Sequence, residues 1–136
     1  MESKSKEVIV MISIIVFSKG RPMQLHAYLE SLLKYSDAQQ KWITVLCCEM
    51  EKIRYEKVKK SFPEVNWVTE TRFETDLKQA IAQANDYIMF GCDDVVFTRK
   101  FSLEKACEYL KANEQVFGFS MRLGENIKPM PENLSK

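Results

Sequence analysis

The stretch that decides the fold is VIVMISIIVF, residues 8–17, which is the most apolar segment of the chain. Its ten residues are too few to cross a bilayer as a helix. The charged, turn-forming SKGRP that follows is unlike the small-residue cleavage site of a signal peptide. Valine and isoleucine recur without polar alternation, as is typical of a central parallel strand covered on both faces. We therefore predict a buried strand at residues 8–17.

The rest of the chain alternates between strand-like and helix-like segments. Pro22 suits the first turn of a helix, and leucines spaced by three or four residues extend this helix to near Tyr35. Further strands are expected at residues 42–48, 66–69, 86–91 and 115–122. Further helices are expected at about residues 50–62, 76–85 and 103–113, the last with Ser102 as its N-cap. This order, with short connections, predicts a Rossmann-like α/β fold in which helices flank a parallel sheet.

Length, net charge and cysteine content limit the number of domains, the partners and the location that we expect for this chain. The 136 residues fit one domain, 1–136, whose ends at 1–7 and about 128–136 we expect to be flexible. With 20 basic and 19 acidic residues the net charge is +1, so nucleic acid is not an expected partner. The four cysteines form no C-x-x-C pair and there is one histidine, which argues against zinc. Reduced thiols and a cytoplasmic location are the simpler interpretation.

Two adjacent aspartates follow the strand predicted at residues 86–91, in the stretch FGCDDVVF, residues 90–97. Ligands of open α/β sheets bind beyond the carboxyl ends of the strands. The neighbouring charges of Asp93 and Asp94 repel each other, and Mg²⁺ or Mn²⁺ would relieve that repulsion. Successive side chains of an extended chain point in opposite directions, so the two carboxylates can serve different roles. An ordinary solvated turn is the alternative interpretation.

Other polar residues are expected at the same edge of the sheet. Residues 18–21 follow the first strand, Glu49 follows the second, and the loop after the third contains Arg72. Each has a simpler explanation: Glu49 as a solvated strand end or helix cap, Lys19 and Arg21 as surface charges, and Arg72 as the partner of a neighbouring glutamate. Together they predict a rim that carries both cations and carboxylates.

Four stretches in this order resemble a known family. They are VIVMISIIVFSKGRPMQLHAYLESL (residues 8–32), WITVLCCE (42–49), DYIMFGCDDVVFTRKF (86–101) and VFGFSMRLGENI (116–127). The chain is similar, over about residues 8–127, to the nucleotide-binding half of GT-A-fold glycosyltransferases of the family-two type. The acidic pair occupies the position of that family's DxD motif, and Cys92 stands where many members have a further aspartate.

The resemblance implies roles for individual residues. Phe17, Ser18 and Arg21 would lie along the nucleotide base and its phosphates. Glu49 would lie near the base or ribose, and Arg72 falls in the loop that flanks the nucleotide.

The two aspartates would act at the diphosphate. Asp93 would contact the ribose or a metal-bound water, and Asp94 would ligate Mn²⁺ or Mg²⁺ bridging the diphosphate of a sugar nucleotide. Asp93 and Asp94 are therefore the two candidate metal residues.

The resemblance also implies a reaction. The partners would be a nucleoside-diphosphate-sugar donor and an unknown saccharide, lipid or protein acceptor, and a homo-oligomer is compatible with the sequence. No catalytic base is identified, and because the chain stops soon after the fifth expected strand, the acceptor-binding half is expected to be missing. A noncatalytic or truncated nucleotide-binding module is therefore the alternative function. A response-regulator-like domain is disfavoured, because Ser-Lys-Gly-Arg rather than an acidic pair follows the first strand.

Overall fold

A four-stranded sheet forms the centre of the molecule. The structure, a computed structural model, describes residues 12–50 and 52–121. The strands are β1 (Ile12–Lys19), β2 (Ile43–Cys48), β3 (Asn66–Thr69) and β4 (Tyr87–Cys92). Their order is β3-β2-β1-β4, and every neighbouring pair is parallel. All four carboxyl ends therefore meet at one edge of the sheet.

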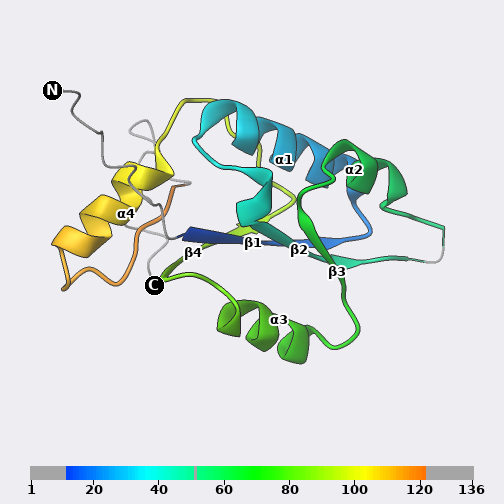
Figure 1. Cartoon of the computed structure of the whole chain (residues 1–136). Coiled ribbons are helices and arrows are strands. Elements are labelled where there is room, and N and C mark those ends of the chain that lie inside the picture. The colour runs from blue at the N-terminus through cyan, green and yellow to red at the C-terminus, as the bar shows by residue number, and fades with distance from the viewer. Residues whose placement is uncertain (1–11, 51, 122–136) are drawn as a thin grey trace, which may run out of the picture.

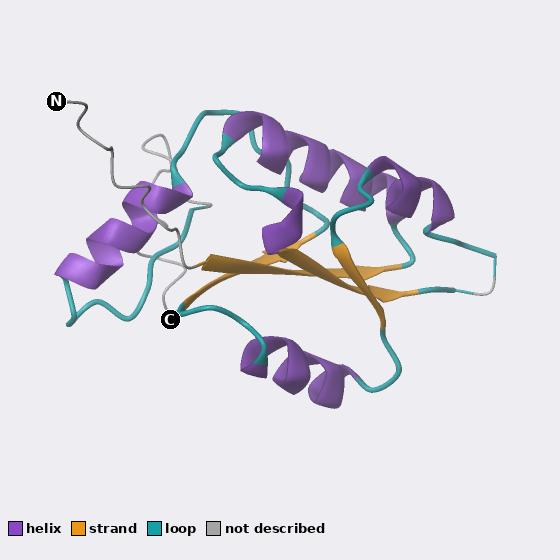
Figure 2. Ribbon diagram, viewed as in Figure 1, coloured by secondary structure: helices purple, strands orange, loops and turns teal. Residues whose placement is uncertain are grey.

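Helices cover both faces of this sheet (Figure 1). The helices α1 (Pro22–Tyr35) and α2 (Glu56–Ser61) lie over one face, and α3 (Phe73–Ala82) lies over the other (Figure 2). A short 3₁₀ turn, Gln40–Trp42, precedes β2, and α4 (Leu103–Ala112) begins beside the C-terminal end of α1. The predicted α/β fold, with a Rossmann-like parallel sheet flanked by helices, is confirmed. No helix of the described residues is long and apolar enough to cross a membrane.

The apolar first strand explains why the sheet forms around β1. Its alternate residues Ile12, Ile14 and Val16 pack into the core beneath α1, while Ile15, which faces the opposite side, is also buried. A strand buried on both faces gains stability from nearly every side chain, at roughly 25 cal/mol per Å² of apolar surface removed from water. The predicted buried strand is confirmed for residues 12–17. Its first part, residues 8–11, lies outside the described residues, as do the ends expected to be flexible.

The fifth strand predicted at residues 115–122 is wrong for its described part. Residues 115–121 form no strand and pair with none of the described strands. Phe117 is fully exposed and Phe119 is about half exposed. An alternating apolar pattern favours a strand only where a neighbouring strand completes the hydrogen-bond ladder, and this segment has no such neighbour among the described residues.

The second and third helices begin elsewhere than predicted. The helix expected from residue 50 starts only at Glu56, because Tyr55 turns into the core while Met50 and Ile53 form a bridge of their own. The helix α3 starts at Phe73, three positions earlier than predicted. Its early start follows from Asp76, whose carboxylate accepts hydrogen bonds from the two backbone amides that precede the helix. The predicted N-cap Ser102 is confirmed, since its Oγ accepts from the backbone N–H of Lys105 at 3.1 Å.

We predict that Gly91→Ala destabilises the protein. A Cβ at Gly91 would lie 2.0 Å from the hydroxyl oxygen and 2.6 Å from Cζ of Tyr28, whose side chain is buried. Overpacking of this kind costs about 1–3 kcal/mol. Chemical denaturation should show a lower free energy of unfolding for this variant. Gly118→Ala is the control, because a Cβ there meets no atom within 4 Å. Equal stability of the two variants would contradict the close packing of Tyr28 against β4.

Candidate functional site

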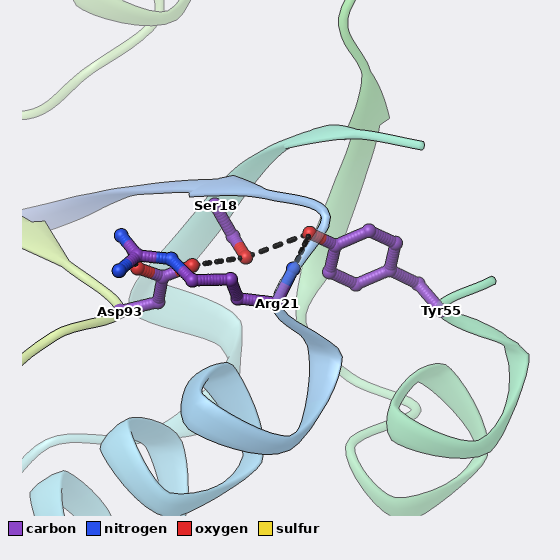
Figure 3. Close-up of polar contacts among 4 residues, drawn as sticks. All are labelled: Ser18, Arg21, Tyr55 and Asp93. Atoms are coloured by element: carbon purple, nitrogen blue, oxygen red, sulfur yellow. Dashed lines mark hydrogen bonds and ion pairs between the residues drawn. The ribbon is translucent and has the colours of Figure 1, made fainter. Parts of the chain in front are cut away.

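The carboxyl ends of β1 and β4 bring Ser18 and Asp93 together. Phe17 lies beside Cys92 in the parallel register, and the backbone N–H of Asp93 donates to the carbonyl of Phe17 at 3.2 Å. The side chains of the next two residues, Ser18 and Asp93, therefore point toward the face of the sheet that α1 and α2 cover. Ser18 Oγ donates to Asp93 Oδ2 at 2.7 Å, although the two residues are separated by 75 positions. This pair is the centre of the candidate site (Figure 3).

A third buried group, the hydroxyl of Tyr55, completes a chain of hydrogen bonds. It lies 2.8 Å from Ser18 Oγ and accepts from the backbone N–H of Arg21 at 3.2 Å. A serine hydroxyl has a single proton, and Ser18 gives its proton to Asp93. Tyr55 must therefore donate to Ser18. The chain runs in one direction, from the amide of Arg21 through Tyr55 and Ser18 to the carboxylate.

The side chain of Arg21 closes this chain into a loop. Its Nη2 lies 2.5 Å from Asp93 Oδ1, and its side chain remains 49% exposed while that of Asp93 is fully buried. A buried carboxylate is costly unless a cation and hydrogen-bond donors compensate it. Ser18 compensates Oδ2 with its hydrogen bond, and Arg21 compensates Oδ1 through the ion pair, since Oδ1 accepts no hydrogen bond among the described residues.

The turn between β1 and α1 sets the position of Arg21. Gly20 has a φ of +62°, a left-handed conformation that glycine adopts without strain. Its backbone N–H donates to the carbonyl of Cys48 at the end of β2, at 3.0 Å. The chain then enters α1 with Pro22 at the first helical position, as predicted. Arg21 is thereby held at the edge of the sheet, between β1 and the helix.

Asp94 follows directly and differs from its neighbour, because it is exposed. No group of three or more histidine, cysteine, aspartate or glutamate side chains within residues 12–50 and 52–121 is arranged to hold a metal ion. Mg²⁺ and Mn²⁺ often take only one or two carboxylates and complete their shells with phosphate oxygens and water. The carboxylate of Asp94 is exposed to solvent, whereas that of Asp93 is buried.

Phe17 lies at the same edge but on the opposite face of the sheet. Its ring contacts Phe73 at the start of α3, with ring centroids 5.7 Å apart, and stacks on Phe90 at 6.1 Å. Both partners are about half exposed. The alternation of side chains along β1 thus separates an aromatic surface, formed by these three rings, from the polar chain at Ser18.

Glu49 and Arg72 do not join the polar chain. Glu49 accepts a hydrogen bond from Arg54 at 2.9 Å, and this bond lowers the pKa of Glu49 below its ordinary value. Arg72 is the exposed N-cap residue of α3, and none of the ion pairs found among the described residues involves it. Glu74, considered as its partner, pairs instead with Lys78 at 2.6 Å. The expected contacts of Glu49 and Arg72 with a nucleotide stay predictions.

Sequence reasoning missed Tyr55. Its neighbourhood, KIRYEKVKKSF, is interpreted from sequence as a solvated basic helix face, yet Tyr55 is 0% exposed. An aromatic residue among charged neighbours is a weak signal of burial. No local pattern could indicate that its hydroxyl reaches Ser18, because the contact depends on how the segment before α2 packs against β1.

A groove of about 650 Å³ lies near this site but does not include its carboxylates. It runs between α1 and the segment 54–61, and its lining includes Met23, His26 and Lys57. His26 lies 5.1 Å from the ring of Phe62 and 3.8 Å from Glu30. His26 is thus a partly exposed position of helix α1.

Sequence comparison relates this chain to a curated glycosyltransferase. The chain is 34% identical, over an alignment of 128 residues, to a bifunctional glycosyltransferase, pgtA, of Dictyostelium discoideum. The alignment covers 85% of this chain but 17% of the relative. No protein-family profile matches the chain, and no solved structure does so significantly. The similarity therefore relates the chain to part of a larger glycosyltransferase and supports a role in glycosyl transfer in general.

Asp76 makes the loop that contains Arg72 sensitive to acid. Hydrogen bonds from the backbone amides of Thr71 and Arg72 lower the pKa of Asp76 below its ordinary value. A carboxyl group whose pKa is lowered by folding stabilises the folded state at pH values above its ordinary pKa. This stabilisation is lost as the pH falls through the folded-state pKa.

We predict that Asp76→Asn lowers stability slightly at pH 7 and that the difference from wild type shrinks below about pH 4. Thermal unfolding across this pH range measures the difference. Asp86→Asn, at another exposed aspartate, is the control and should change stability little at any pH. A difference for Asp76→Asn that stays constant down to pH 2.5, about one unit below the ordinary value, would contradict the role of its charge.

Proposed function

We propose that this chain, which is similar to part of a bifunctional glycosyltransferase, is the nucleotide-sugar-binding part of a GT-A-type, family-two-like glycosyltransferase. One observation carries the proposal: a buried Asp93 holds Arg21 at the carboxyl edge of a parallel sheet, and an exposed Asp94 follows it directly. This is the edge at which open α/β sheets bind their ligands. The sugar would pass to a saccharide, lipid or protein acceptor.

The exposed part of Arg21 supports binding of a diphosphate. An arginine has five N–H donors; Nη2 of Arg21 forms the ion pair with Asp93, and the side chain is 49% exposed. The remaining donors can reach phosphate oxygens, with which arginine forms strong charge-assisted hydrogen bonds. A cation fixed beforehand at this edge would stabilise the negative charge that develops on the departing diphosphate.

The proposed metal role belongs first to Asp94. Its exposed carboxylate suits Mn²⁺ or Mg²⁺ held together with the phosphate oxygens of the donor. Such an ion, when bound, would neutralise charge on the diphosphate. A direct contact of Asp93 with the metal or the ribose stays a prediction, although its engagement by Ser18 and Arg21 favours an indirect part.

The other residues of the edge would surround the rest of the nucleotide. Phe17, with its exposed aromatic neighbours, offers an apolar surface for the base. Glu49 and Arg72 belong to the adjacent loops and would approach the base or ribose from there. We assign no catalytic base to the described residues.

We predict that nucleoside diphosphates raise the melting temperature in the presence of Mn²⁺. The test compares UDP, GDP and CDP, each with and without the metal. Asp94→Asn should weaken the Mn²⁺-dependent binding by about tenfold or more, as expected for a lost charge-assisted contact of about 1.5–3 kcal/mol. Asp86→Asn, an exposed aspartate just before the amino end of β4, should bind like wild type.

Hydrolysis of the sugar-nucleotide donors separates the two functional alternatives. Turnover supports a glycosyltransferase, whereas Mn²⁺-dependent binding without turnover supports a noncatalytic binding module. The proposed metal role of Asp94 fails if Asp94→Asn retains the full Mn²⁺ effect.

A further inference from the structure

We infer that Tyr55 is a positioning residue for the diphosphate site, acting through Ser18, Asp93 and Arg21. The inference rests on the proposed function, because it concerns how Arg21 is prepared to meet a diphosphate. Neither the strand-end residues nor the family resemblance points to Tyr55. It comes from the segment before α2, whereas its partners belong to β1, to the turn before α1 and to the end of β4.

The hydrogen bonds between Tyr55, Ser18 and Asp93 run in one direction. Because Ser18 gives its proton to Asp93, it needs a donor of its own, and Tyr55 supplies it at 2.8 Å. The bond fixes the rotamer in which the serine faces the carboxylate. Without the phenol, the serine hydroxyl could turn toward other acceptors, and Asp93 Oδ2 would lose its donor.

Tyr55 also holds the backbone of Arg21. The phenol oxygen accepts from the Arg21 N–H at 3.2 Å, at the point where β1 ends and α1 begins. Arg21 is thus held twice, at its backbone by Tyr55 and at its guanidinium by Asp93. Pre-organised donors are more effective for charge stabilisation than donors that must be ordered on binding.

The side chains of this hydrogen-bonded chain are buried. Tyr55, Ser18 and Asp93 are 0%, 4% and 1% exposed, so water has little access to replace a missing phenol. A buried tyrosine needs only one partner for its hydroxyl. Here the hydroxyl contacts two groups, Ser18 Oγ and the backbone N–H of Arg21, and Figure 3 shows a dashed line from it to each.

The test compares Tyr55→Phe with wild type in binding of pyrophosphate and of UDP, GDP and CDP, with and without Mn²⁺. The variant keeps the aromatic ring and removes the oxygen. Affinity should fall by about fivefold to tenfold, which corresponds to the net contribution of about one hydrogen bond. Tyr28→Phe is the control, because Tyr28 is equally buried and its hydroxyl lies beside Gly91 instead of Ser18. It should bind like wild type.

A double-mutant cycle separates positioning from mere stabilisation. In an Arg21→Ala background, Tyr55→Phe should no longer change the affinity, because the group that it orients is gone. A purely structural tyrosine would weaken binding equally in both backgrounds, and that result would overturn the inference. If Tyr55→Phe does not fold by circular dichroism, Ser18→Ala breaks the same link and should show the same dependence on Arg21.

Failure of this inference differs from failure of the proposed function. If Arg21→Ala weakens binding but Tyr55→Phe and Ser18→Ala do not, Tyr55 has no positioning role and the diphosphate site stands. If Arg21→Ala leaves the affinity unchanged for every probe, or if wild type binds none of them, the proposed site is wrong and the inference falls with it.

Discussion

The buried charge of Asp93 is the constraint on which the arrangement of the sheet edge depends. Moving a carboxylate out of water costs several kcal/mol, even after a protein relaxes around it. The structure offsets that cost with the Arg21 guanidinium and the Ser18 hydroxyl. These partners are available only if β4 lies beside β1 and the chain turns sharply at Gly20. A single side chain thus links the sheet order to the conformation of the first turn.

Much of the fold could be predicted because it depends on local patterns. The apolar run of β1, the proline that starts α1 and the strand Asn66–Thr69 all follow from composition over a few residues. The fifth strand could not be predicted correctly, because a strand also needs a neighbour. The late start of α2 likewise depends on a long-range contact, because Tyr55 packs into the core, where its hydroxyl meets Ser18.

The candidate site was predictable in part, for a topological reason. In a parallel sheet the strand ends meet, so Ser18, Arg21 and Asp93 were expected near one another, and they are in contact. The same rule could not assign faces. The family resemblance placed Phe17 with Ser18 and Arg21 along the nucleotide, whereas strand alternation turns the ring of Phe17 to the α3 side, where it contacts Phe73. Nor does the rule describe loops, so the pairing of Glu49 with Arg54 was missed.

The span of 75 positions between Ser18 and Asp93 has a consequence for folding. Contacts between distant parts of a chain form slowly, because the entropy of closing the intervening loop is lost before the contact is gained. The edge of the sheet therefore takes shape only once β4 has docked on β1. A metal–diphosphate complex bound as proposed, with Arg21 on its phosphates and Asp94 on its metal ion, would bridge the ends of these two strands. Such a ligand would oppose their separation, so that ligand binding would also stabilise the native state.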